Sequence, residues 1–168
     1  MRGYTLLELM VTVALLALMS AMTAVGLQPL QARFRLHQAT DATAQFLVRS
    51  RQRAMDTGRC HQIEVLADGI PVRPGTPGDM LRVSRRRDAD CESTVDPLAL
   101  IEVERIRLPE RMQVTQVQSD AIVFRPTGRT RGDASWSFQV GNAEASRVVV
   151  AAPHGPVCVS EDAGGSCP

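Results

Sequence analysis

Apolar residues crowd into the N-terminal part of this 168-residue chain, and the remainder is far more polar. The run from Leu9 to Leu27 contains no charged residue. As an α-helix rising about 1.5 Å per residue, this run nearly matches the roughly 30 Å hydrocarbon thickness of a bilayer. The pattern therefore predicts either a membrane-spanning helix or a secretion signal.

Glu8 and the length of the apolar run bear on that choice. A cleaved signal peptide would need a basic start, which Arg2 supplies, and small residues at a cleavage step, which the chain has around Val25. The apolar run is long for that purpose. Glu8 lies at its edge, and a carboxylate near the middle of a membrane costs about 2.5–3.5 kcal/mol on insertion scales. A membrane-spanning helix therefore needs a partner that compensates this charge.

Helical periodicity continues beyond Pro29, a residue that can kink a helix where it leaves the bilayer. Apolar residues recur on one face, opposite a polar face; these residues are Leu30, Phe34, Phe46, Leu47 and Ala54. We predict one long helix over 4–57, ended by Gly58 in a C-terminal capping position. Its first half, 4–28, would span the membrane, and its amphipathic second half, 29–58, would pack on a domain.

Beyond Gly58 the chain changes to short runs rich in Val, Ile and Leu with turn residues between them, which is typical of β-strands. The predicted strands are Cys60–Leu66, Met80–Arg85, Leu98–Leu108, Gln113–Val117, Ala121–Arg125, Ser135–Val140, Arg147–Ala151 and Pro156–Val159. Prolines and glycines within 71–78 predict a surface loop. With aromatic residues at only 4%, the core must be aliphatic. We therefore predict an α+β fold, in which residues 59–168 form a β-rich globular part with antiparallel sheets packed on the helix.

The charges nearly cancel, with 19 Lys and Arg against 18 Asp and Glu, for a formal net charge of +1. This balance argues against a general nucleic-acid binder, which needs a basic face. Arg85–Arg87 is followed directly by acidic residues and is predicted to be a solvated loop. Within Gly128–Arg131, however, Arg129 and Arg131 share a glycine-flanked turn that could hold adjacent phosphates. They are the local candidates for DNA binding, which the overall charge does not favour.

The four cysteines make an even number, as expected in a compartment where disulfides persist. The sequence alone allows three pairings. We favour Cys158 with Cys167, which would close a loop at the tail, and Cys60 with Cys91, which would tie the first strand to a later loop.

Signatures of catalysis and metal binding are missing from the sequence. It has no Cys-x-x-Cys pair, and its three histidines lack ligand spacing. It also lacks a Gly-x-Ser-x-Gly turn, a phosphate-binding glycine loop and a His-Glu-x-x-His helix. Glu102 and Glu104 are predicted on one charged outer face of a strand. We therefore expect no enzymatic activity, no cofactor and no metal.

The N-terminal string from Arg2 to Met10 resembles the class III leader of type IV pilins and type II secretion pseudopilins. Their pattern is a basic leader, Gly, an aromatic residue and Thr-Leu-x-Glu-Leu. The resemblance implies that prepilin peptidase cuts after Gly3, so that 1–3 is the leader and Tyr4 the N-methylated first residue. In a filament, the Glu8 carboxylate would then pair with the Tyr4 ammonium of a neighbouring subunit.

Residues 46–55, 122–128 and 147–155 resemble the H-type pseudopilins (GspH) and the FimT minor pilins. This implies a minor pseudopilin of the type II secretion system, a structural subunit near the tip of the periplasmic pseudopilus that is needed for protein export. It would be a single-pass inner-membrane protein with its globular part in the periplasm, and its partners would be other pseudopilins or pilins. The alternative is a FimT-like minor pilin of a type IV pilus that binds DNA during uptake, because Gly128–Arg131 is similar to the Gly-Arg-x-Arg element of that family.

Overall fold

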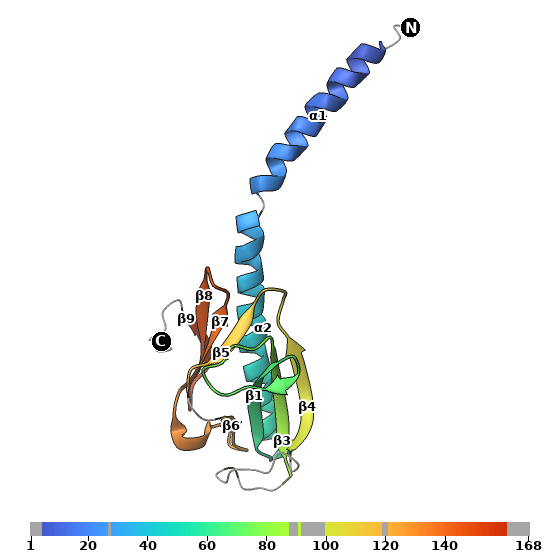
Figure 1. Cartoon of the computed structure of the whole chain (residues 1–168). Helices are drawn as coiled ribbons and strands as arrows, with labels where there is room; N and C mark the ends of the chain where they lie inside the picture. Colours follow the sequence, from blue (N-terminus) through green and yellow to red (C-terminus); the bar gives the residue numbers. More distant parts are fainter. Residues whose placement is uncertain (1–4, 27, 88–90, 92–99, 119–120, 161–168) are drawn as a thin grey trace. The chain divides into compact units, whose positions relative to one another are not determined.

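The computed structural model describes residues 5–26, 28–87, 91, 100–118 and 121–160 (Figure 1). The chain divides into two compact units, Met1–Arg35 and Leu36–Pro168. We describe each unit by itself.

The first unit contains helix α1 (Leu6–Gly26) and the beginning of helix α2 (Gln28–Thr57). Both ranges are helical as predicted, and the continuity of the predicted helix falls on Leu27, which lies outside the described residues. Pro29 lies in the first turn of α2, where its fixed φ angle and missing N–H group are tolerated. Within the described ranges, no helix has both the length and the apolar character that crossing a bilayer requires.

From Leu36 onward, α2 buries one side in the second unit. Buried residues recur every three or four positions and include Ala39, Phe46, Leu47 and Ala54. Three small polar residues are also buried on this side, because each hydroxyl donates to the main-chain carbonyl four residues earlier at 2.7–2.9 Å; these are Thr40, Thr43 and Ser50. The helix ends at Thr57, and Gly58 has a φ angle of +61°, which fits the predicted C-terminal cap.

One sheet is built on strand β1 (His61–Ala67), which pairs along its whole length with β3 (Met80–Arg86). The opposite edge of β1 pairs with β2 (Ile70–Pro71) near its end and with β6 (Ile122–Phe124) near its start. Strand β4 (Leu100–Arg107) pairs with β3 on the outside. All of these pairs are antiparallel, and β2 is a strand that the sequence pattern did not predict.

The second sheet has the order β5-β7-β8-β9 and is also antiparallel. Its strands are β5 (Gln113–Gln116), β7 (Trp136–Gly141), β8 (Ser146–Ala151) and β9 (Val157–Ser160). Gly78 bridges to Val114 through two main-chain hydrogen bonds of 2.8 and 2.9 Å, which links the two sheets. A Cβ atom at position 78 would lie 2.3 Å from the Leu66 carbonyl oxygen, so this close approach requires glycine.

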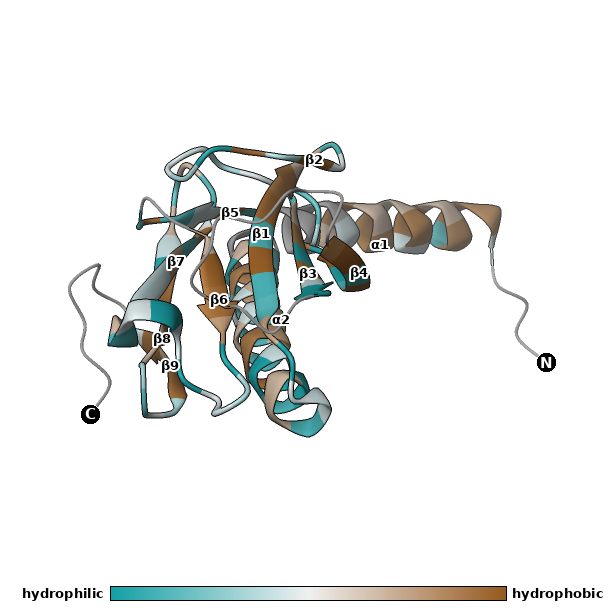
Figure 2. Ribbon diagram, turned by 90° about the horizontal axis from the view of Figure 1, so that it is seen from below, coloured by the Kyte–Doolittle hydropathy of each residue, from teal (hydrophilic) through white to brown (hydrophobic). Residues whose placement is uncertain are grey.

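The core lies between α2 and the inner faces of the two sheets and is mainly aliphatic, as predicted. Strand β1 alternates Ile63 and Val65 inward with Gln62 and Glu64 outward, and Figure 2 shows this alternation of apolar and polar residues. The α+β architecture of a helix packed on antiparallel sheets is confirmed (Figure 1).

The register of β4 separates two carboxylates that were predicted on one face. A register shift between Val83 and Ser84 places Glu104 opposite Val83, and Glu102 opposite Ser84. Glu104 therefore contacts arginines of α2, with Arg49 at 3.2 Å and Arg53 in direct hydrogen bond. Glu102 instead pairs with Arg105 at 2.7 Å on the outer face.

The arginines predicted in a solvated loop are partly structural. Arg85 and Arg86 belong to β3, and Arg86 is 2% exposed. Its guanidinium donates to the Gln62 side-chain oxygen at 3.1 Å. A buried arginine of this kind is held by its hydrogen bonds.

A disulfide joins Cys60 to Cys91, with the two Cα atoms 5.6 Å apart. Both cysteines pack with Val123 in a small buried cluster. This pairing is the one predicted between the first strand and a later loop. The other predicted pairing, Cys158 with Cys167, lies outside the described residues because Cys167 is not among them.

Candidate functional site

The N-terminal motif opens helix α1 with a capped first turn. Thr5 precedes the helix, and its hydroxyl and carbonyl oxygens accept hydrogen bonds from the Glu8 main-chain N–H at 3.4 and 3.1 Å. Glu8 is the third residue of the helix, where a negative charge interacts favourably with the helix dipole. Sequence reasoning missed this role of Thr5, although the Thr-x-x-Glu spacing is a known capping signal. The predicted cleavage residues, Gly3 and Tyr4, lie outside the described residues.

Helix α1 presents apolar side chains on every side. Each described residue from Leu6 to Ser20 is exposed, including Leu6 at 78% and Met19 at 70%. A helix that is apolar all round is stable only when it is covered by other apolar groups. An apolar surface of this extent marks a site of contact with other apolar groups.

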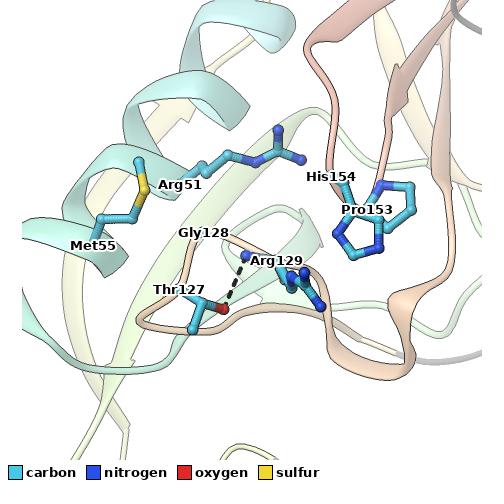
Figure 3. A pocket seen from close by; sticks show the side chains of 7 residues that line it. All are labelled: Arg51, Met55, Thr127, Gly128, Arg129, Pro153 and His154. Atoms are coloured by element: carbon cyan, nitrogen blue, oxygen red, sulfur yellow. Dashed lines mark hydrogen bonds between the residues drawn. The ribbon is translucent and has the colours of Figure 1, made fainter.

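A second candidate site is a pocket of about 310 Å³ in the β-rich unit, which we call the basic pocket. Three segments far apart in the sequence form it: the end of α2, the loop after β6 and the loop between β8 and β9 (Figure 3). Its lining residues are Arg51, Met55, Thr127, Gly128, Arg129, Pro153 and His154. It thus contains two arginines and a histidine, and no carboxylate lines it in the part of the chain that the structure describes.

Arg51 fixes the geometry of the basic pocket. Its guanidinium donates hydrogen bonds to the main-chain carbonyls of Ala152 and Gly155 in the β8–β9 loop. The same group stacks over the Phe124 ring, 5.2 Å from its centroid. Burial lowers the pKa of Arg51, yet a guanidinium stays charged at any physiological pH. Arg51 therefore supplies a fixed positive charge and holds one wall of the pocket in place.

The opposite wall is the turn at Gly128, which packs directly against α2. Gly128 has a φ angle of +77°, and a Cβ atom there would lie 2.7 Å from the Met55 sulfur. The Gly128 N–H donates to the Arg125 carbonyl at 2.9 Å, which closes the turn. The Arg129 N–H contacts the Thr127 hydroxyl at 3.5 Å (Figure 3). The Arg129 side chain is exposed at the rim of the pocket, so its guanidinium can meet a ligand.

The two arginines that were predicted to act together differ in their relation to the basic pocket. Arg129 lines the basic pocket, whereas Arg131 lies in the short helix η2 (Arg131–Asp133), is half-buried and does not line it. Arg51 and His154 take part in its place. No local sequence signal could have found these two residues, because only the folded chain brings them next to Arg129.

The described ranges contain no group of three or more His, Cys, Asp or Glu side chains placed to hold a metal ion.

Comparison with known proteins finds a matching N-terminal motif and a similar fold. Residues 1–24 match the family described as the prokaryotic N-terminal methylation motif. The fold is similar to two crystal structures of the type IV minor pilin FimU of Pseudomonas aeruginosa strain PAO1. One has 13% identity and a TM-score of 0.56 and covers 76% of this chain and 90% of that chain. The other has 14% identity and a TM-score of 0.52 and covers 74% of this chain and 92% of that chain. No curated protein matches the chain in sequence.

The N-terminal motif and the fold together define a type IV pilin-like protein. The two solved structures to which its fold is similar are both of a type IV minor pilin. A pilin-like protein implies assembly with other pilins and processing by prepilin peptidase. These features are consistent with a component of a pilus or a pseudopilus.

Proposed function

We propose that this chain is an H-type minor pseudopilin, a structural subunit near the tip of the type II secretion pseudopilus that protein export requires. The observation that carries the proposal is the capped apolar helix α1, exposed on every side, in a chain whose compact α+β unit bears no enzymatic motif. Residues 46–55 and 122–128, which resemble both the H-type pseudopilins and the FimT minor pilins, support this group of minor subunits.

In this proposal, prepilin peptidase cuts after Gly3, and Tyr4 becomes the methylated N-terminus. The uncharged run from Leu9 to Leu27 supports residence in the inner membrane before assembly. On assembly, α1 packs among the same helices of other subunits, so its apolar surface stays covered throughout. Glu8 then pairs with the Tyr4 ammonium of a neighbour, which offsets the cost of removing both charges from water.

Deletion of the gene in its host cell tests the choice of system. We expect secretion of type II substrates to stop while surface pili remain, and we expect expression of the full chain to restore secretion. Loss of pili with normal secretion would instead identify a minor pilin of a type IV pilus.

A FimT-like DNA-binding minor pilin is the second candidate, supported by the exposed Arg129 side chain within Gly128–Arg131, which is similar to the Gly-Arg-x-Arg element of that family. A salt-dependent gel shift of the full chain in detergent with duplex DNA tests this function. Substitution Arg129→Ala should abolish the shift, whereas Arg131→Ala, outside the pocket, should leave most of it. Absence of any shift at low salt would exclude this candidate.

A further inference from the structure

We infer that the basic pocket receives a carboxylate side chain from a neighbouring subunit of the filament. This inference rests on the proposed function, since it takes a filament subunit as the partner. It assigns a binding role to Arg129, with Arg51, Thr127 and His154 as supporting residues.

The charges of the pocket select an anion. Arg51 and Arg129 together provide two positive charges, and none of the seven lining residues is acidic. The two terminal nitrogens of Arg51 already donate to main-chain carbonyls, so this residue contributes charge and shape. Arg129 is exposed and can present its planar guanidinium to two oxygens of one carboxylate. The Thr127 hydroxyl, which accepts from the Arg129 main-chain N–H at 3.5 Å, adds a polar group to the same wall of the pocket.

The remaining walls fit an amino-acid side chain. Met55 and Pro153 add an apolar surface against which the methylene groups of a glutamate can pack. Val48 lies two helical turns before Met55 on the same side of α2, and these side chains are 50% and 41% exposed. Arginine and methionine are enriched at protein interfaces, and the centre of such an interface combines apolar contacts with a few polar anchors.

The same features disfavour nucleic acid as the occupant. Proteins that hold single strands provide large aromatic side chains for base stacking, and no Phe, Tyr or Trp lines this pocket among the described residues. A duplex would require several free cations along a groove, yet Arg131 lies outside the pocket. The net charge of +1 supplies no wider basic field.

Titration of the full chain in detergent micelles with short peptides tests the inference. The probes are acetyl-Leu-Glu-Leu-amide and the matched acetyl-Leu-Gln-Leu-amide, with inorganic phosphate and a thymidine oligonucleotide as further arms. Nuclear magnetic resonance would follow the side-chain N–H of Arg129 and the His154 ring. We expect the glutamate peptide alone to shift both signals saturably. Equal responses to the two peptides, or tighter saturation by the oligonucleotide or phosphate, would overturn the inference.

Two charge-reversal variants show whether the response belongs to this pocket. Arg129→Glu should weaken binding of the glutamate peptide by roughly tenfold or more, because it places like charges together. The control is Arg73→Glu, an equal charge change on an exposed loop residue outside the pocket, which should change binding by less than about twofold. Equal losses in the two variants would show only a general charge effect and would contradict the assignment.

Incorporation into filaments separates this inference from the proposed function. We expect Arg129→Glu to be processed normally but to enter filaments less than Arg73→Glu does. If Arg129→Glu enters filaments as the unmodified chain does, the role of the pocket fails while the filament function stands. If the unmodified chain enters no filament although the glutamate peptide binds, the proposed function and the assigned partner both fail.

Discussion

The guanidinium of Arg51 on helix α2 donates a hydrogen bond to the main-chain carbonyl of Gly155, a residue 104 positions further along the chain. A second hydrogen bond, to Ala152, attaches the same side chain to the same loop. Arg51 therefore links the end of the helix to the β8–β9 connection, and this link shapes the basic pocket.

Replacement of Arg51 should destabilise the β-rich unit. Arg51→Ala removes two charge-assisted hydrogen bonds and the contact with the Phe124 ring, so we expect the free energy of unfolding to fall by about 2–3 kcal/mol. Urea denaturation of the chain in detergent micelles measures this change. The control is Arg49→Ala, whose ion pair with Glu104 is half exposed and should contribute less than about 1 kcal/mol. A larger loss for Arg49→Ala would contradict the role of Arg51.

The Cys60–Cys91 disulfide should stabilise the chain by about 2–4 kcal/mol, since it closes a loop across 31 positions and restricts the unfolded chain. The double substitution Cys60→Ser and Cys91→Ser should lower the midpoint of urea unfolding accordingly. Treatment of this variant with a reductant then reports on the predicted Cys158–Cys167 bond alone. An unchanged midpoint in the double variant would show that the first bond adds nothing to stability.

Stability should fall as the pH falls below about 6.5, because of His61. This residue is 1% exposed, and its ring contacts the Arg59 carbonyl at 3.1 Å. Burial lowers the pKa of His61, the Arg59 contact opposes that effect, and the charges of Arg85 and Arg53 add to the lowering. The unfolded chain therefore takes up a proton at a higher pH than the folded chain does, which favours unfolding in acid.

Unfolding measured between pH 7.5 and 5.5 tests the role of His61. His61→Asn should reduce the slope of stability against pH, which for one proton is at most about 1.4 kcal/mol per pH unit. His154→Asn, at an exposed position, provides the control and should keep the slope. If the unmodified chain and His61→Asn show the same slope of stability against pH, His61 does not cause the loss of stability in acid.

The sequence predicted most of the domain because the relevant signals are local. Alternation along β1 and the glycine at position 58 mark their elements directly, and both lie where they were expected. Both helical ranges, Leu6–Gly26 and Gln28–Thr57, follow from the periodicity of the sequence, and Pro29 lies in the first turn of the second. The register shift beside Val83 has no local signal, and it separates Glu102 from Glu104.

The two candidate sites also differ in whether a local sequence signal marks them. The N-terminal motif is a continuous string, so Glu8 could be identified from spacing alone. The basic pocket combines Arg51, Arg129 and His154 from three separate segments. Of the two arginines that the sequence suggested as a pair, Arg129 lines the basic pocket and Arg131 lies in η2 outside it.

Glu8→Leu tests how α1 assembles with other subunits. Loss of this carboxylate would leave the Tyr4 ammonium of a neighbour buried without a partner, at a cost of about 3–5 kcal/mol. We therefore expect incorporation into sheared filaments to fall by about tenfold or more, while cleavage of the leader continues. Thr5→Ala, which alters only the helix cap, should have a smaller effect. Normal assembly of Glu8→Leu would contradict the proposed pairing.

Mass spectrometry of the N-terminal peptide of the protein isolated from its host tests the central claim most directly. If the chain is a processed pilin-like subunit, the mature protein begins at Tyr4 and carries one methyl group on its α-amine. An N-terminus that still carries Met1, or one that begins near Leu27 after signal-peptide cleavage, would contradict the account.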